Sequence, residues 1–495
     1  MKNNKYILGI TVFLSGAVVM IFELVGSRVL GPYFGTSIFV WTSLIGIILG
    51  SLSLGYYLGG KIADKRPSFN NLALVICISA AFVLITVLTK DFLLGFLRVN
   101  ITEIRISSVL ASIMLFLPAS VFLGMVSPYA VKLKLNDLKS SGSTVGNLYA
   151  LSTLGSIVGT FLAGFYLVPH FGTDNLLMIL AMVLVLLALA LFARELKKMK
   201  LFLGIVVVFG LVIIGGFNDS LKSSKFIDID TTYNRIWIYD HVDYNSGEMV
   251  KIMGINNENH SSMFLESDEL VNEYTKYYHL AKHFNPDFKS TLMFGGAGYS
   301  YPKDFLVKYP EATIDVVEID PEVTELAKKY FRLKEDPRLT IHHEDGRVYL
   351  NRTEKKYDVI FGDAFTSRYS VPYQLTTIEA VKKEYEILND DGIVLLNLIS
   401  SMEGDRGQFL RAEYATYKAI FPQVYLFPVT DMENGDKVQN VLLVALKSDK
   451  EASFVSEDEI FSEYLQHLWL NDIPLDRPIL TDDFAPVDYY IGKAI

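Results

Sequence analysis

The chain has 495 residues, of which 51% are hydrophobic, and its mean hydropathy is +0.30. Both values are high for a soluble protein, and the length allows two or three domains. The formal net charge of -10 argues against a nucleic-acid partner. The single cysteine, Cys77, excludes a disulfide within the chain and a zinc site built from cysteines.

The apolar residues are concentrated before about residue 217, in stretches long enough to cross a bilayer as helices, which takes roughly 20 residues each. Seven spans are predicted: Tyr6–Val25, Ile38–Gly60, Asn71–Thr89, Ser107–Val131, Thr144–Val168, Asn175–Ala193 and Leu201–Phe217. The first half of the chain, residues 1–217, is therefore predicted to be a seven-helix membrane domain. Its partner would be the lipid bilayer, and the protein would pass through the cell membrane several times.

Local motifs in this half predict how the helices pack. Three glycine pairs at a spacing of four predict close helix contacts: Gly46/Gly50, Gly55/Gly59 and Gly155/Gly159. Pro118 and Pro128 predict a kink or a break in the fourth span. Glu23 and Arg28 flank the end of the first span. They could be an interfacial pair that fixes helix depth or a functional intramembrane acid with its partner.

Basic residues are concentrated in the loops on one side of these predicted spans. Lys2 and Lys5 precede the first span, and further Lys and Arg residues follow the second, fourth and sixth spans. The positive-inside rule places these loops in the cytoplasm. With seven spans, the same rule places the C-terminal half outside it.

The second half is predicted to be soluble. Residues 218–272 contain a polar linker and a small β lobe, in which strands Tyr233–Asp240 and Met249–Ile255 flank a turn at Tyr244–Gly247. Residues 273–495 form an α/β domain. It begins with a helix at Glu273–Phe284, and from Ser290 the pattern is β-α-β-α, which predicts a mainly parallel sheet.

Residues suited to binding a nucleotide follow successive predicted strands of this sheet. They are the glycine turn Gly295, Gly296, Ala297 and Gly298, then Glu318 and Ile319, then Asp345 and Gly346, and finally Asp363. Glycines let a backbone approach a ligand, and an acid after the second strand can bond both ribose hydroxyls. An acid at 363 could take a proton from an attacking amine or pair with a cation. Each acid alone could also be a cap or a turn residue, but together they favour an adenosine pocket.

The region from about Tyr233 to Tyr425 resembles the spermidine synthase family of polyamine aminopropyltransferases, and in particular its forms fused to a multi-span membrane domain. The resemblance implies a class I methyltransferase-like, Rossmann-like sheet behind a small β lobe. It also implies transfer of an aminopropyl group from decarboxylated S-adenosylmethionine to putrescine, with release of methylthioadenosine. Asp363 would then accept the proton, Glu318 would hold the ribose, and Asp345 and Gly346 would hold adenine. His260 would stand where the family has a cofactor-binding glutamine.

The acceptor side departs from the family pattern. Gly298 stands where the family has an acid that grips the aminopropyl amine, and Thr366 replaces a second acid that holds the diamine. Tyr274, or alternatively His279, lies near the family's Tyr-His-Glu segment. A compensating acid could come from the tail, as Asp482 or Asp483.

Three functions remain open for this pocket. The first is transfer of an aminopropyl or related alkyl group to an amine, with S-adenosylmethionine or its decarboxylated form as co-substrate. The second is methyl transfer or cleavage of the cofactor, and the third is a non-catalytic nucleotide sensor. No metal is expected, and a homodimer is an open possibility. Supply of an adenosyl co-substrate favours the cytoplasm, against the seven-span count.

Overall fold

The computed structural model describes residues 2–101, 103–135, 141–192, 226–256, 258–364 and 371–494. The chain divides into two compact units, Met1–Ser224 and Lys225–Ile495. The first unit is helical and the second is an α/β unit with a separate small sheet. The predicted span Leu201–Phe217 and the candidate Thr366 lie outside the described residues.

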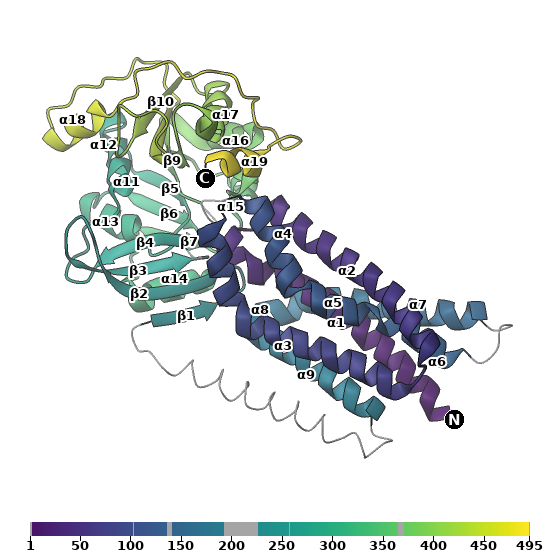
Figure 1. Cartoon of the computed structure of the whole chain (residues 1–495). Helices are drawn as coiled ribbons and strands as arrows, with labels where there is room; N and C mark the ends of the chain where they lie inside the picture. Colours follow the sequence, from purple (N-terminus) through teal and green to yellow (C-terminus); the bar gives the residue numbers. More distant parts are fainter. Residues whose placement is uncertain are drawn as a thin grey trace. The chain divides into compact units, whose positions relative to one another are not determined.

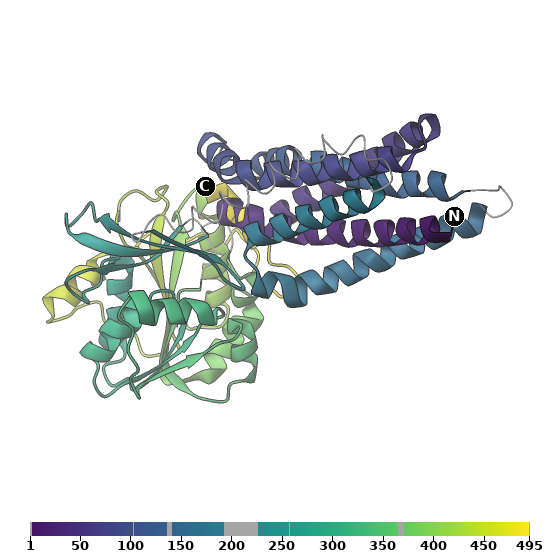
Figure 2. The same ribbon diagram turned by 90° about the horizontal axis from the view of Figure 1, so that it is seen from below.

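The first unit is a bundle of long helices that run alongside one another (Figures 1 and 2). Its helices are α1 (Lys2–Phe34), α2 (Ile38–Lys65), α3 (Phe69–Asn100), α4 (Ile104–Leu115), α5 (Leu117–Gly124), α6 (Val126–Lys134), α7 (Ser141–Leu162), the π-helical turn η2 (Ala163–Leu167), α8 (Val168–His170) and α9 (Thr173–Phe192). Five helices are long and apolar enough to cross a membrane, and the bent segment from α4 to α6 adds a sixth if it is one span. Six of the seven predicted spans therefore fall on these helices.

Close approach of helices occurs at two of the three predicted glycine pairs. A Cβ on Gly155 of α7 would lie 1.9 Å from the Phe13 carbonyl oxygen of α1, and one on Gly55 of α2 would lie 2.3 Å from the Val121 carbonyl oxygen of α5. Neither Gly46 nor Gly50 has an atom within 4 Å of its Cβ position. The prediction of a close contact at this pair is wrong for the described part of the chain.

The predicted break in the fourth span is confirmed, because α4 and the segment after it meet at an angle of 51°. The hydroxyl of Thr86 donates to the Leu115 carbonyl at 2.8 Å, and that of Ser79 donates to the Ala119 carbonyl at 3.1 Å. Side chains of α3 thus supply hydrogen bonds to carbonyls beside the break, as such a bend requires in an apolar environment.

The first helix is longer than predicted. Because α1 continues to Phe34, Glu23 and Arg28 lie within it and do not flank its end. Their predicted place at the helix end is therefore wrong.

The small lobe of the second unit is a four-stranded antiparallel sheet in the order β1-β2-β3-β4. Its strands are β1 (Phe226–Asp230), β2 (Arg235–Val242), β3 (Met249–Ile255) and β4 (Glu258–Phe264). The two predicted strands are β2 and β3, and two more flank them. Buried Ile236 and Met253 share an apolar core with Val323 of the larger sheet's helix layer. The Asn234 amide also donates to Asp320 at 3.1 Å, which ties the lobe to the end of β6.

The larger sheet has seven strands in the order β10-β11-β9-β8-β5-β6-β7. They are β5 (Ser290–Phe294), β6 (Thr313–Val317), β7 (Leu339–His342), β8 (Tyr357–Gly362), β9 (Leu388–Ser400), β10 (Gln423–Pro428) and β11 (Gln439–Leu446). Strands β5 to β9 are parallel, and β11 and β10 are antiparallel additions. Strand order reverses between β5 and β8, and open α/β sheets bind ligands at such a point.

Helices cover both faces of this sheet (Figure 1). One face packs on α11 (Glu273–Lys276), α12 (Leu280–Phe284), α13 (Ser300–Lys308), α14 (Pro321–Tyr330) and α18 (Glu459–Gln466). The other face packs on α15 (Gly346–Arg352), α16 (Ile378–Ile387), α17 (Gln408–Lys418) and α19 (Val487–Ala494). The single helix predicted over Glu273–Phe284 is divided by a 3-10 turn, η4 (Tyr277–His279).

Candidate active site

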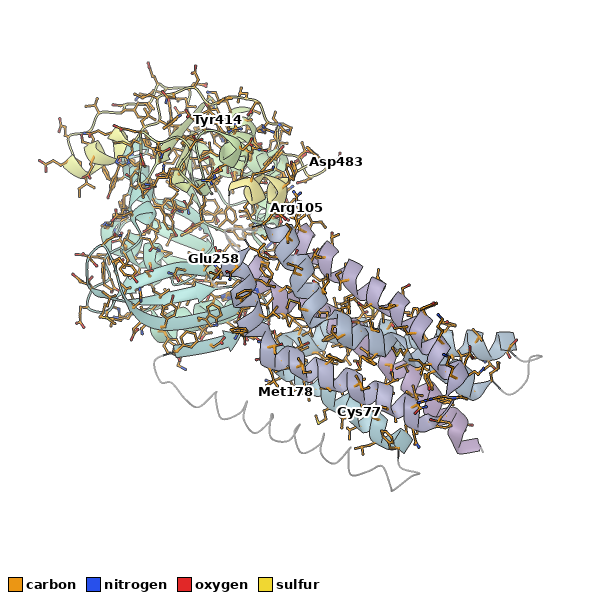
Figure 3. The ribbon with its side chains drawn as sticks, viewed as in Figure 1. Cys77, Arg105, Met178, Glu258, Tyr414 and Asp483 are labelled. Atoms are coloured by element: carbon orange, nitrogen blue, oxygen red, sulfur yellow. The ribbon has the colours of Figure 1, made fainter. Side chains whose placement is uncertain are left out.

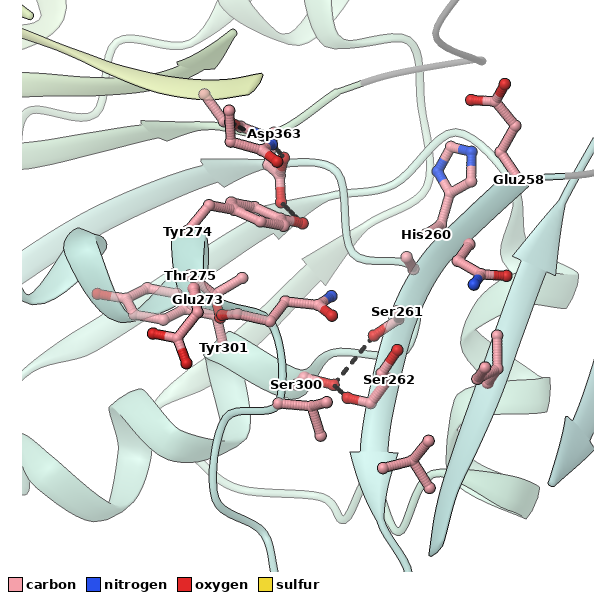
Figure 4. A pocket seen from close by; sticks show the side chains of 18 of the residues that line it. Glu258, His260, Ser261, Ser262, Glu273, Tyr274, Thr275, Ser300, Tyr301 and Asp363 are labelled. Carbon is pink, nitrogen blue, oxygen red and sulfur yellow. Dashed lines mark hydrogen bonds between the residues drawn. The ribbon is translucent and has the colours of Figure 1, made fainter. Parts of the chain in front are cut away.

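Two cavities meet at the carboxyl ends of the central parallel strands. The smaller has a volume of about 180 Å³ and is lined by Glu318, Ile319, Asp345 and Gly346 among others. The larger, of about 510 Å³, lies between the β lobe and α11 (Figure 4). Both cavities are lined by His260, Gly295, Ala297 and Asp363. A ligand extending from one cavity into the other would pass these shared residues.

The glycine turn brings the ends of β5 and β8 together. Gly295 has a φ of +90°, and a Cβ there would lie 2.4 Å from the Asp363 carbonyl oxygen. Only glycine fits this position without a shift of backbone. The turn therefore fixes Asp363 beside the junction of the two cavities.

Glu318 ends β6 with its carboxylate directed at the glycine turn. Its Oε2 accepts from the backbone N–H groups of Gly296 at 2.9 Å and Ala297 at 3.2 Å, and its Oε1 accepts from Asp320 at 3.0 Å. Burial raises the pKa of Glu318, and these N–H donors oppose the rise. A carboxylate has about four acceptor positions. With three positions occupied by backbone N–H groups, one acceptor position of Glu318 remains for a ligand hydroxyl while the glycine turn keeps this geometry.

Asp345 has a structural role and also lines the smaller cavity. Its Oδ1 caps α15 by accepting from the backbone N–H groups of Arg347 at 2.9 Å and Val348 at 3.1 Å. Its Oδ2 accepts from the Gln374 amide at 3.3 Å. A Cβ on Gly346 would lie 3.2 Å from both Phe294 and Leu375, so the missing side chain makes room for this wall of the cavity.

Asp363 is held between two donors. The Tyr274 hydroxyl donates to its Oδ2 at 3.1 Å, and the Asn397 amide donates to its Oδ1 at 3.1 Å (Figure 4). Asn397 in turn accepts from the Asn440 amide at 3.0 Å. Desolvation raises the pKa of Asp363 to about 6, although the bonds from Asn397 and Tyr274 lower it. The group is thus a carboxylate at neutral pH with a proton affinity suited to general-base catalysis.

The protonation states around Asp363 suit a cationic ligand. Burial lowers the pKa of His260 to about 4, so its imidazole is neutral at pH 7 and does not repel a positive charge. Burial, followed by the charge of Asp363, raises the pKa of the Tyr274 hydroxyl well above its usual range. Tyr274 therefore stays protonated and remains a donor to Asp363.

Several carboxyl side chains line the cavities. They are Asp243, Glu258, Glu273 and Asp363 in the larger cavity, and Glu318, Glu344, Asp345 and again Asp363 in the smaller. Among the described residues, no lysine or arginine lines either cavity. The described parts of the chain also contain no group of three His, Cys, Asp or Glu side chains placed to hold a metal ion.

Comparisons with known proteins agree with this geometry. The family model described as "Spermine/spermidine synthase domain" matches residues 273–431. The polyamine aminopropyltransferase of Vibrio vulnificus is 30% identical over 218 residues, which cover 41% of this chain and 71% of that enzyme. The chain belongs to the polyamine aminopropyltransferase family. It is an aminopropyltransferase, and the resemblance drawn from its motifs is confirmed.

Other matches to this family differ in extent. Polyamine aminopropyltransferase 2 of Aquifex aeolicus is 22% identical over 375 residues, which cover 73% of this chain and 72% of that protein. A match of that length extends beyond the α/β unit. A solved structure of a probable spermidine synthase from Corynebacterium glutamicum has a TM-score of 0.42 and 21% identity, and the match covers 51% of this chain and 90% of that one.

Most of the sequence-predicted site residues of this aminopropyltransferase are brought together. The residues predicted to bind the cofactor line one or both cavities: His260, Gly295, Gly296, Ala297, Glu318, Ile319, Asp345 and Gly346. Tyr274 and Asp363 lie at the junction and are hydrogen-bonded to each other. These positions follow from the strand order, because the carboxyl ends of parallel neighbours meet at one edge.

His279, the alternative to Tyr274 as an acceptor-binding residue, lines neither cavity, so the structure does not bring it to the site as predicted. Its side chain packs against α13, where Nδ1 bonds the Tyr309 hydroxyl at 2.8 Å and Nε2 lies 2.8 Å from Asp304. Because His279 follows Tyr274 by five residues, the two side chains point in different directions on a helix, about 140° apart.

The tail acids are also placed elsewhere. Asp482 pairs with Arg347 at 2.7 Å, and Asp483 is exposed at the periphery of its unit (Figure 3). Neither lines a cavity. The structure does not bring these predicted acceptor-binding acids to the site, because the tail packs beside α15 and α16.

Two features of the site were not predicted. Asn397 and Asn440 continue the hydrogen-bond chain behind Asp363, and the only available signal was a polar residue inside the apolar run Ile393–Ile399. The second feature explains a departure from the family pattern. A Cβ on Gly298 would lie 2.6 Å from the Ser261 hydroxyl and 2.9 Å from the Phe331 ring, so an acidic side chain has no room there.

Proposed function

We propose that the enzyme transfers the aminopropyl group of decarboxylated S-adenosylmethionine to an amine acceptor and releases methylthioadenosine. The observation that carries the proposal is the position of Asp363 at the junction of two acid-lined cavities. In this proposal adenosine occupies the smaller cavity, with Glu318 at the ribose and Asp345 and Gly346 at adenine. The acceptor enters the larger one, beside Tyr274.

The chemistry follows from this arrangement. The acceptor nitrogen attacks the carbon next to the sulfonium, a C–N bond forms, and the C–S bond breaks to leave a neutral thioether. Asp363 takes the proton that the nitrogen loses. Positioning both reactants in adjoining cavities supplies much of the rate enhancement, because the encounter becomes intramolecular.

The charges favour the decarboxylated co-substrate over S-adenosylmethionine itself. A carboxylate on the transferred group would be desolvated without a cationic partner among the described lining residues. The transferred ammonium and a polyamine acceptor are both positive and are attracted by the lining acids. The Ser261 and Ser300 hydroxyls, 3.0 Å apart, offer neutral acceptors beside Gly298, where the family acid has no room.

A product assay tests this function directly. Purified full-length protein is incubated with decarboxylated or intact S-adenosylmethionine, with and without putrescine, and the products are identified by mass spectrometry. Methylthioadenosine together with an aminopropylated amine is expected from the decarboxylated form. Adenosylhomocysteine would indicate methyl transfer, methylthioadenosine without an acceptor would indicate cleavage, and intact co-substrate despite binding would indicate a sensor.

The pH dependence of the reaction should report Asp363. Only the carboxylate accepts a proton, so we expect log(kcat/KM) to rise with unit slope below a pKa of about 6 and then to level off. The acceptor amine has an ordinary pKa near that of lysine, about 10, so it is an ammonium throughout this range and gives its proton to Asp363. Initial rates from pH 5 to 9 measure the rise and the plateau. A flat profile below pH 7 would contradict the assignment of Asp363 as the base.

We propose that the helical unit crosses the cell membrane and that the α/β unit faces the cytoplasm. Six crossings, with the bent α4–α6 segment counted as one, return the chain to the cytoplasmic side at the end of α9. The basic stretch Arg194–Lys200 follows there, as the positive-inside rule favours. Supply of the co-substrate supports the same side. This count of crossings excludes one by the seventh predicted span, Leu201–Phe217, which lies outside the described residues.

Cysteine labelling should locate the α/β unit. Cys77, the single cysteine, is 2% exposed, so Asp483→Cys introduces one reactive thiol on the surface of that unit. We expect a membrane-impermeant maleimide to label it only after the cells are permeabilised. The wild-type chain is the matched control and should stay unlabelled. Labelling of intact cells would place the unit outside.

A further inference from the structure

One wall of the smaller cavity is a short segment that contains the 3-10 turn η5 (Tyr373–Leu375). This segment contributes Pro372, Gln374 and Leu375 to the cavity lining. The Gln374 amide donates to Asp345 at 3.3 Å, and Leu375 lies against Gly346. The position of η5 therefore sets the shape of the cavity at its Asp345 end.

Arg347 holds this wall in place from the first turn of α15. Its Nη1 donates to the Gln374 carbonyl at 2.7 Å and to the Thr377 hydroxyl at 2.9 Å. The side chain is 14% exposed, so these bonds are shielded from solvent. Arg347 follows Asp345 and Gly346 directly in the chain. It therefore connects the side of the cavity formed by these two residues to the side formed by η5.

Asp482, far along the chain in the tail, orients the Arg347 guanidinium. Its two carboxylate oxygens accept from Nη1 at 3.1 Å and Nη2 at 2.7 Å, and its Oδ1 also accepts from the Thr377 hydroxyl at 2.7 Å. A two-pronged carboxylate contact fixes the plane of a guanidinium as well as its position. The tail is itself anchored, because the Leu480 carbonyl accepts from the Ile378 N–H at 2.8 Å.

We infer that Asp482 is a positioning residue for the adenosyl co-substrate, acting through Arg347 on the η5 wall of the smaller cavity. The nature of the ligand rests on the proposed function. The tail thereby contributes to affinity for the co-substrate from outside the cavity. It takes no part in holding the acceptor or in proton transfer.

Binding of methylthioadenosine to full-length protein in detergent tests this inference by titration calorimetry, with steady-state kinetics alongside. Asp482 is half exposed, which limits the effect of its charge, so we expect Asp482→Asn to raise the Kd by roughly 3- to 5-fold. The KM for the co-substrate should rise in parallel, while kcat and the acceptor KM stay within about twofold. Asp482→Glu should restore part of the affinity, and Asp483→Asn, the matched exposed neighbour, should change nothing.

The outcomes separate the inference from the proposed function. Wild-type protein that binds no methylthioadenosine would overturn the proposed function and the inference with it. Wild-type protein that binds, with Asp482→Asn binding equally well, would overturn the inference alone. Equal losses in kcat, both KM values and thermal stability would also overturn it, because they would show a general structural role. Thr377→Val, which removes one bond to the same carboxylate, should give a smaller rise in Kd.

Discussion

Asp363→Asn should reduce kcat by roughly 10²- to 10⁴-fold, the usual range for loss of a positioned general base. The amide keeps the shape of the side chain at the junction of the cavities but cannot accept the proton of the attacking amine. Binding of methylthioadenosine should stay within about threefold of wild type, because Glu318 and Asp345 are unchanged. Single-turnover rates of aminopropyl transfer and calorimetry measure the two quantities separately.

The control for this variant is Asp390→Asn, an exposed aspartate near the start of β9, which should leave both quantities unchanged. The acidic limb of the pH profile should also disappear in Asp363→Asn, since the group with a pKa of about 6 is gone. An Asn variant with more than a tenth of the wild-type kcat would remove Asp363 from proton transfer.

Glu318→Gln should weaken binding of methylthioadenosine by roughly 10- to 100-fold, which corresponds to the loss of a charged hydrogen bond of about 1.5–3 kcal/mol. The carboxylate accepts from three backbone N–H groups, and a glutamine would turn an NH₂ group toward some of these donors. The glycine turn would have to shift, and the ribose would lose its acceptor. At saturating co-substrate, kcat should fall much less than kcat/KM.

Glu325→Gln on the exposed side of α14 is the matched control for the loss of one glutamate charge in the same region. Its affinity for methylthioadenosine should equal that of the wild type. If Glu318→Gln also bound with wild-type affinity, the smaller cavity would not be the ribose site.

Much of the cofactor side could be predicted because its signals are local. Gly295 lies in a glycine turn after a strand, and Glu318 and Asp345 each follow the next strand. Parallel strands in consecutive βα units bring their carboxyl ends to one edge, so strand order alone places these residues together. The break in the fourth span could also be predicted, because a proline disrupts helical hydrogen bonding at its own position in the chain.

The acceptor side could not be predicted in the same way. Tyr274 and His279 were predicted as alternatives on one helix, but at a spacing of five residues they point about 140° apart, and only the packing of His279 on α13 shows which of them faces the cavities. Asn397 and Asn440 meet only because β11 adds antiparallel to β9, a pairing that leaves no pattern in either strand. Helix α1 is also longer than the apolar stretch from which it was predicted, because it continues past Glu23 and Arg28 to Phe34.

The sequence by itself determined the family, the α/β sheet and the series of residues from Gly295 to Asp363. These depend on short segments and on the rule that the carboxyl ends of parallel strands meet at one edge of the sheet. Only the tertiary structure decided which distant side chains complete the site. It placed Asn397 behind Asp363, excluded an acid at Gly298, and paired Asp482 with Arg347 at a separation of 135 residues. Such contacts depend on how helices and tail pack over both sheet faces, and that packing is a property of the whole fold.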